Sequence, residues 1–252
     1  MESIKSDEAL RIFLIGLFGE KLDKHAILKG GMVLRLLQCP RYTNDLDYVF
    51  IPFDSKKKII PLIQIVLSEI PEIKLEHRFH STNAQCDVIL KNQFGIFKTQ
   101  MEVNAAEDCE MQSLSTSDLA LHYNQSPHIV RVMRFDVMLA HKLAAWNERR
   151  LMRDLYDIYF IYKFLGELPH LPTLKKRLQK IQYAKRAFSK EKPQQMALED
   201  FLALLEKEAK EISEKGIEME LRDYLSQNES VGLDKKIRIA ILQMVDALKG
   251  KM

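Results

Sequence analysis

The chain of 252 residues has few of the features that mark secreted, membrane or strand-rich proteins. It contains 3 cysteines, and Cys39, Cys86 and Cys109 are far apart with no CxxC spacing. We therefore expect free thiols in a reducing cytoplasm rather than disulfides or a zinc site. The 9 glycines and 8 prolines allow few tight turns for this length, which favours helices over a barrel or sandwich of many short strands.

Long apolar runs are also missing. No segment approaches the roughly 18 consecutive apolar residues of a membrane span, and the opening sequence MESIKSDEALRIF lacks the basic and then apolar pattern of a signal peptide. We therefore expect a cytoplasmic protein that does not associate with membranes. Neither sign of charge predominates, because 38 Lys and Arg are nearly balanced by 35 Asp and Glu. The resulting net charge of +3 does not establish a nucleic-acid partner, but it leaves room for a local basic face.

The apolar pattern divides the chain into two parts. Helical spacing in 7–22, 32–37 and 55–70, with β-forming runs at 26–28, 48–51, 73–79, 86–90 and 96–103, predicts alternating helices and strands followed by clustered strands. Beyond residue 130 the pattern is helical, with one helix over 137–161, a breaker-rich joint at 166–172 and charged helices that include the segment from Lys185. The prediction is an α+β fold. A small mixed sheet flanked by helices occupies residues 1–130, and a helical domain, 131–252, completes a cleft.

One segment, KGGMVLRLLQCPRYTNDLDYV at 29–49, combines residues suited to phosphate chemistry. Asp45 and Asp47 lie two apart at a predicted strand, so both carboxylates point to one face with Cα atoms ~6.6 Å apart. Two such carboxylates repel each other unless a cation lies between them, and a hard divalent ion such as Mg²⁺ suits oxygen ligands. Gly30 and Gly31 precede a predicted helix, where backbone N–H groups can hold an anion. Either motif alone is usually a turn, but together and in this order they favour phosphoryl or nucleotidyl transfer.

These residues also carry a resemblance. KGGMVLRL followed by RYTNDLDY is similar to the nucleotidyltransferase superfamily of polymerase β, and most closely to its AbiEii/AbiGii toxin branch. The matching positions are Lys29, Gly30, Gly31, Leu34, Arg35, Arg41, Thr43, Asp45 and Asp47. The resemblance implies that Lys29, Gly30, Gly31, Arg35, Arg41 and Thr43 bind nucleotide and that Asp45 and Asp47 hold Mg²⁺. Met32 departs from the pattern, because the branch has a small hydroxyl residue there.

A second motif, FDVMLAHKLAAWNERRLMRDLYDIY at 135–159, resembles the helical motif of the same branch. On a single helix, Lys142, Arg149 and Arg153 would form a basic stripe that could neutralise a triphosphate or lie along RNA. Lys142 lies in an apolar stretch and needs an anionic partner, which Asp154 or Asp157 could supply. A solvated helix face and a structural salt bridge are the alternatives. The resemblance favours a catalytic role for Lys142 and Asp154 and a nucleotide-binding role for Arg149.

The superfamily normally has a third metal carboxylate on a neighbouring strand. Glu102, in the alternating run before Val103, is the candidate, and Asp87 is the second choice. An exposed strand acid is the simpler explanation for both. Tyr42, Tyr48, Tyr156 and Tyr159 could stack on a base, but their spacing is more typical of core or rim positions.

The resemblance implies a Mg²⁺-dependent nucleotidyltransferase that moves a nucleoside monophosphate from an NTP to an acceptor hydroxyl. It also implies the toxin of a type IV toxin–antitoxin or abortive-infection system, with RNA, specifically a tRNA 3′ end, as acceptor and an antitoxin as partner. Two alternatives stay open. One is a small-molecule transferase of the antibiotic-modifying kind, and the other is a non-catalytic module that keeps the fold and binds a partner protein.

Overall fold

The computed structural model describes residues 4–181 and 195–251, and within them the chain forms two compact units, Met1–Arg134 and Phe135–Met252. The sequence-based boundary at residue 130 lies inside the last strand of the first unit, whereas the division in the structure follows Arg134. The part of the predicted charged helices that runs from Lys185 to residue 194 lies outside the described residues. No described helix is both long enough and apolar enough to cross a membrane.

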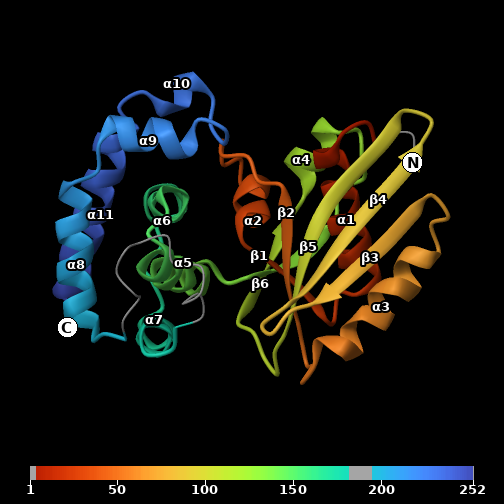
Figure 1. The fold of residues 1–252 in the computed structure, drawn as a ribbon, viewed down its shortest axis with the longest axis horizontal. Helices are drawn as coiled ribbons and strands as arrows, with labels where there is room; N and C mark the ends of the chain where they lie inside the picture. The colour runs from red at the N-terminus through yellow and green to blue at the C-terminus, as the bar shows by residue number, and fades with distance from the viewer. Residues whose placement is uncertain (1–3, 182–194, 252) are drawn as a thin grey trace. The chain divides into compact units, whose positions relative to one another are not determined.

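Unit 1 is built on one mixed sheet of seven strands in its described residues (Figure 1). The strands are β1 (Ala26–Lys29), β2 (Asp45–Phe50), β3 (Ile73–Phe79), β4 (Ala84–Asn92), β5 (Gly95–Ala105), β6 (Met111–Ser115) and β7 (Ile129–Met133). They lie in the order β3-β4-β5-β2-β1-β7-β6, in which β2 pairs in parallel with β5, β1 pairs in parallel with β7, and the other neighbours are antiparallel. The predicted mixed α/β class is therefore confirmed.

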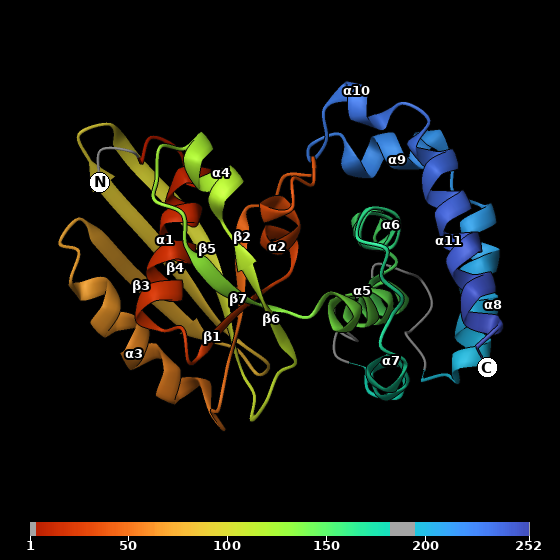
Figure 2. The ribbon, with the colours of Figure 1, turned by 180° about the vertical axis from the view of Figure 1, so that it is seen from behind.

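In residues 4–134, four helices accompany this sheet. They are α1 (Asp7–Lys21), α2 (Gly31–Leu36), α3 (Lys56–Ser68) and α4 (Ser117–His122). Figure 2 shows α1 lying across the front of the strands, where the ring of Phe18 meets that of Tyr48 with centroids 5.6 Å apart. The side chain of Ser6 caps α1 by accepting a hydrogen bond from the backbone N–H of Ala9, as expected for a serine at this position.

The two faces of the central strands differ because side chains alternate along a strand. The face toward the core carries buried apolar side chains at alternate positions on β2, β4 and β5, namely Leu46, Tyr48, Phe50, Cys86, Val88, Met101 and Val103. The opposite face carries Asp45 and Asp47. Cys39, Cys86 and Cys109 are free thiols, as predicted.

Unit 2 is helical in its described residues. Its elements are α5 (Phe135–Arg149), α6 (Met152–Phe164), α7 (Leu171–Leu178), α8 (Leu198–Lys210), α9 (Glu214–Leu221), α10 (Gln227–Ser230) and α11 (Leu233–Lys249). Helices α8 and α11 contact each other, and each buries one apolar side, which includes Phe201 and Leu205 on α8 and Ile241 and Val245 on α11. The breaker-rich segment at 166–172 joins α6 to α7, as predicted.

Two predictions from the sequence pattern need correction. The single helix expected over 137–161 is two helices, because Arg150 adopts a left-handed conformation (φ 55°) and ends α5 before α6 begins at Met152. The segment between 104 and 129, for which the pattern predicted no elements, contains β6 and α4. Both elements are short, and their periodicity is correspondingly weak.

Candidate active site

Asp45 and Asp47 lie on β2 and share one face of the sheet, with the fully buried Leu46 between them on the other face. The strand register places Lys29 of β1 opposite Asp47 on one side and Glu102 of β5 opposite Asp47 on the other. Paired residues on neighbouring strands point to the same face. The register therefore brings Lys29, Asp47 and Glu102 into one row across the polar face.

The Gly30–Gly31 turn packs directly against this row. Gly30 has φ 76° and ψ −153°, a conformation that only glycine adopts readily, and a Cβ there would collide with Oδ2 of Asp47. A Cβ on Gly31 would lie 2.8 Å from Oγ1 of Thr43 and 3.0 Å from Nη2 of Arg41. Both glycines are therefore required by close approach, and the turn and the acidic strand form one packed structure.

Arg41 and Arg35 hold the loop between the turn and β2. Arg41 is buried, and its Nη1 donates to the carbonyl of Tyr42 at 3.1 Å. Arg35 donates through Nε to Glu8 at 2.9 Å and through Nη1 to the carbonyl of Cys39 at 2.8 Å. These contacts give both arginines a structural role in the loop, beside the nucleotide-binding role that the resemblance implied.

Glu8 anchors Arg35 and was not identified from the sequence. Its carboxylate also accepts a 2.5 Å hydrogen bond from the Tyr123 hydroxyl. Burial alone would raise the pKa of Glu8, but the hydrogen bonds from Tyr123 and Arg35 outweigh it, so the pKa is lowered. Burial, together with the bond to Glu8, raises the pKa of Tyr123 to about 12. A charged residue in the first turn of α1 is common as a helix cap, so no local signal revealed this network.

Met32, the departure from the toxin-branch pattern, is fully buried in α2. Its side chain therefore packs in the core. The absence of a hydroxyl at this position removes one possible phosphate contact from the turn, while the backbone and Lys29 stay in place.

The sequence also predicted a third carboxylate at Glu102 or Asp87. Glu102 shares the face and row of Asp47, and its Oε2 accepts a hydrogen bond of 2.7 Å from Nδ2 of Asn83. Asp87 lies further away on β4, opposite Gln100. In residues 4–181 and 195–251, no group of three His, Cys, Asp or Glu side chains converges as a metal site would require. The structure thus offers two adjacent carboxylates at the turn rather than a completed three-ligand cage.

This donor set fits Mg²⁺. The ion is commonly bound by one or two protein carboxylates, with water and substrate phosphates completing its octahedral shell. The lack of a Cβ on Gly30 lets the side chain of Asp47 pack against the turn, so the proposed metal ligand and the turn that precedes α2 are in contact. Asp45 and Asp47 are the residues that would hold the ion.

In unit 2, the lysine of the second motif is held by a buried carboxylate. Nζ of Lys142 on α5 lies 2.6 Å from Oδ2 of Asp157 on α6, whose side chain is 1% exposed. Asp154 binds Arg149 instead, through two hydrogen bonds of 2.6 and 3.1 Å. Of the two aspartates that the sequence offered as partners of Lys142, the structure therefore pairs Asp157 with it.

The predicted basic stripe on one helix is wrong, because Arg153 belongs to α6 and not to the helix that carries Lys142 and Arg149. A third ion pair, which the sequence analysis did not identify, joins Arg177 of α7 to Glu148 of α5 at 2.9 Å. Both of its side chains are buried. Buried ion pairs of this kind fix the mutual arrangement of the helices that contribute them.

The chain matches a known protein family over most of its length. The sequence model of the family described as "Nucleotidyl transferase AbiEii toxin, Type IV TA system" matches residues 13–239. A comparison with curated protein sequences gave no match.

Solved structures share the fold. JHP933 from Helicobacter pylori has a TM-score of 0.56 at 13% identity, and the match covers 99% of this chain and 94% of that one. Another H. pylori protein, provisionally described as a nucleotidyltransferase, has a TM-score of 0.53 at 14% identity, with 97% and 95% covered. At these identities the likeness concerns the fold alone.

Proposed function

Because the chain belongs to the AbiEii family of nucleotidyl transferase toxins of type IV toxin–antitoxin systems, we propose that it transfers a nucleoside monophosphate from an NTP to a hydroxyl of an RNA acceptor. The observation that carries the proposal is the packing of the Gly30–Gly31 turn against Asp47. Through that contact, the turn that we propose binds the phosphates lies beside the carboxylates that we propose bind the metal. Membership of the family also implies a cognate antitoxin.

In the proposed reaction, Asp45 and Asp47 hold Mg²⁺. When bound, the ion neutralises charge on the triphosphate and makes the α-phosphorus more electrophilic. Lys29, opposite Asp47 in the register, supplies a positive charge beside the turn for the β- and γ-phosphates. Arg41 and Thr43 pack closely against Gly31 and so hold the turn in its shape.

The bond changes follow the ordinary course of phosphoryl transfer. The acceptor hydroxyl oxygen forms a bond to the α-phosphorus while the bond between that phosphorus and the bridging oxygen to the β-phosphate breaks. Pyrophosphate leaves, and the hydroxyl proton passes to a carboxylate or to water. Because no covalent intermediate with the protein is needed, the residues act through positioning and charge.

Lys142 and Arg149 of unit 2 provide further positive charge for anionic substrate. Each is held by a buried carboxylate, Asp157 and Asp154 respectively, and each side chain keeps 17% of its surface exposed. A cation oriented in this way is already ordered, so less entropy is lost when a phosphate binds to it. We propose that they bind phosphates of the RNA. As acceptor we propose a tRNA 3′ end, in line with the resemblance.

The experiment combines purified protein, Mg²⁺, each labelled NTP and total RNA. Asp45→Ala and Lys142→Ala are compared with wild type, and Asp54→Ala serves as the matched control, because Asp54 is an exposed carboxylate of unit 1 whose ion pair is at the surface. Label that enters RNA with wild type and control but with neither site variant supports the proposal. Label on a soluble amine or hydroxyl compound, with none on RNA, would replace it with the antibiotic-modifying alternative.

A cellular test addresses the toxin role. Expression is expected to arrest growth, and Asp47→Ala is expected to relieve the arrest at equal protein level. Arrest that persists in Asp47→Ala, or RNA and nucleotides that neither bind nor react, would favour the non-catalytic partner-binding module.

A further inference from the structure

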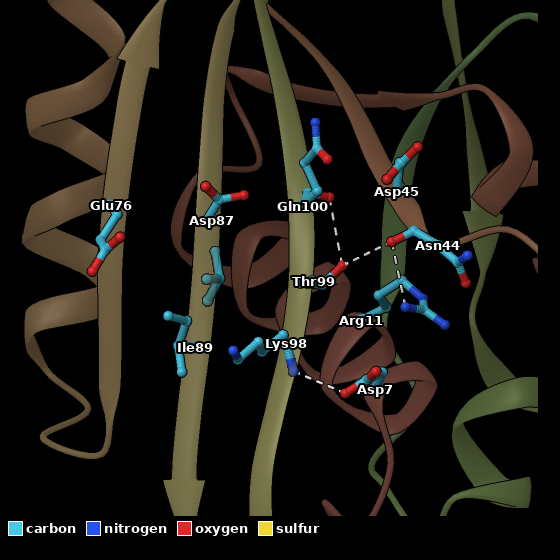
Figure 3. A pocket seen from close by; sticks show the side chains of 11 residues that line it. Asp7, Arg11, Asn44, Asp45, Glu76, Asp87, Ile89, Lys98, Thr99 and Gln100 are labelled. Carbon is cyan, nitrogen blue, oxygen red and sulfur yellow. Dashed lines mark hydrogen bonds between the residues drawn. The ribbon is translucent and has the colours of Figure 1, made fainter.

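An open pocket of about 440 Å³ lies next to Asp45, lined by side chains of the polar face and by Asp7 and Arg11 of α1. We name it the Gln100 pocket, after a residue at its centre, and its lining includes Arg11, Asn44, Asp45, Asp87, Lys98 and Gln100. Figure 3 shows Glu76, Asp87, Gln100 and Asp45 side by side on neighbouring strands. The register agrees, since Asp45 pairs with Gln100, Gln100 with Asp87, and Asp87 with Glu76.

The pocket and the glycine turn flank the acidic pair on different sides. β1, which carries Lys29 and leads into the turn, lies on one side of β2, and β5, which carries Gln100, lies on the other. In an in-line displacement the attacking and leaving oxygens lie on opposite sides of the phosphorus. If the triphosphate lies by the turn, an acceptor in the Gln100 pocket approaches Asp45 from the other side of β2.

The charges of the pocket's own side chains disfavour a polyphosphate as its occupant. Four carboxylates (Asp7, Asp45, Glu76 and Asp87) outnumber two cations (Arg11 and Lys98), which leaves a formal charge of −2. The remaining lining combines amide and hydroxyl groups with the aliphatic Val88 and Ile89. A flat, uncharged group with several hydrogen-bonding atoms matches this lining better than a phosphate chain.

One cation of the pocket is unusually buried. Arg11 of α1 is 5% exposed, and its Nε has no hydrogen-bond partner among the described residues. Among the described residues, its guanidinium makes one long hydrogen bond of 3.4 Å from Nη1 to the carbonyl of Asn44. Burial lowers the pKa of Arg11, although nearby carboxylates including Glu8 and Asp45 counteract it. A buried guanidinium with an unpaired N–H donor favours binding of a single phosphate at the rim of a pocket.

We infer that the Gln100 pocket receives the terminal nucleoside of the acceptor RNA. Its sugar hydroxyl would lie beside Asp45, and Arg11 and Lys98 would face the one phosphate that joins this nucleoside to the rest of the RNA. This inference rests on the proposed function and adds to it the place where the acceptor binds. The pocket contains the base and sugar, so its negative formal charge does not oppose binding of the RNA.

Binding is tested first without any reaction. The side-chain amide signals of Asn44 and Gln100 are followed by NMR in ¹⁵N-labelled protein as unphosphorylated cytidine or adenosine is added. Both signals are expected to shift, while the amide of Asn92, which donates to the carbonyl of Ile4 away from the pocket, does not. Shifts caused by an aminoglycoside but by neither nucleoside would overturn the inference in favour of a cationic small molecule.

Steady-state kinetics then distinguishes an effect on RNA binding from an effect on NTP binding. Lys98→Gln and Gln100→Ala each remove a polar contact, so the KM for RNA is expected to rise by about tenfold while the KM for the NTP stays within about twofold. Lys91→Gln, an exposed lysine on the same sheet outside the pocket, should change neither value.

Failure of the pocket assignment and failure of the proposed function give different experimental results. If wild type labels RNA but the pocket variants leave the KM for RNA unchanged, the pocket assignment is wrong and the proposed transfer stands. If wild type labels nothing, the proposed function fails, and the NMR titration decides on the pocket by itself. Unchanged Asn44 and Gln100 signals would then overturn the assignment too.

Discussion

Replacing Gly30 with alanine tests the central contact of the site, between the glycine turn and Asp47. The backbone at Gly30 lies in a region that is essentially restricted to glycine, and forcing another residue into such a conformation costs about 1–3 kcal/mol. The new Cβ would also meet Oδ2, Cβ and Cγ of Asp47, so the aspartate must move. Gly30→Ala should therefore both destabilise unit 1 and displace a proposed Mg²⁺ ligand.

Gly95→Ala is the matched control. Gly95 also has a positive φ, of 142°, and lies in the same unit, but a Cβ there would meet only Cζ of Phe97 at an ordinary 3.7 Å. It should therefore show the backbone cost without the collision. Comparing the two variants isolates the part of the effect that comes from Asp47.

A double-mutant cycle gives the decisive number. Because Asp47→Ala removes Oδ2 and Cγ, Gly30→Ala should cost about 0.5–3 kcal/mol less in that background than in wild type, the usual range for residues in contact. Urea unfolding followed by circular dichroism measures the free energies. The only tryptophan, Trp146, lies in unit 2, so its fluorescence reports that unit separately. Equal costs in the two backgrounds would refute the argument that the turn abuts Asp47.

Three further predictions concern groups outside the turn. Glu148→Ala leaves the buried guanidinium of Arg177 without its carboxylate, so unit 2 should lose about 3–5 kcal/mol of unfolding free energy, measured by Trp146 fluorescence. Glu206→Ala breaks more exposed ion pairs and should lose much less, so equal losses would contradict the assignment. Lys142→Met should be better tolerated than Asp157→Ala, because methionine fills the volume while the aspartate variant leaves a half-buried ammonium unpaired; the order of their thermal midpoints tests this. The pKa of Glu8 is lowered below its ordinary value of 4.5, so its contribution to stability is complete above pH 4.5 and is lost as pH falls through the lower folded pKa. Glu8→Gln should flatten the acid limb of a stability–pH curve, and an unchanged curve would show that Glu8 is not the group that titrates.

Local pattern was sufficient for the parts of the fold whose periodicity is long or regular. The bounds of helix α1 and of strands β3, β4 and β5 were predicted within a few residues, because their apolar positions repeat with the helical or the strand period. The break at Arg150 was not predicted, since neither glycine nor proline marks it and an arginine with positive φ has no sequence signature. The short β6 and α4 were missed for lack of enough residues to show a period.

Some features of the candidate site could likewise be predicted from the sequence, and others depend on the tertiary structure. That Asp45 and Asp47 share a face follows from strand alternation, and the sequence alone was enough to predict it. That Gly30 touches Asp47 depends on the antiparallel register of β1 and β2, which pairs Lys29 with Asp47. The Gln100 pocket depends on four strands and on Arg11 from α1, so no local window contained it.

By itself, the order of residues determined the mixed α/β class, the acidic pair and the family to which its motifs belong, because each of these depends on spacing along at most a few turns or strands. Only the tertiary structure decided which charges meet. Lys142 binds Asp157 and Arg149 binds Asp154, although both aspartates lie on one side of the same helix. The physical reason is that ion pairs form between atoms a few ångströms apart, and such distances between α5 and α6 are set by helix packing and by the bend at Arg150.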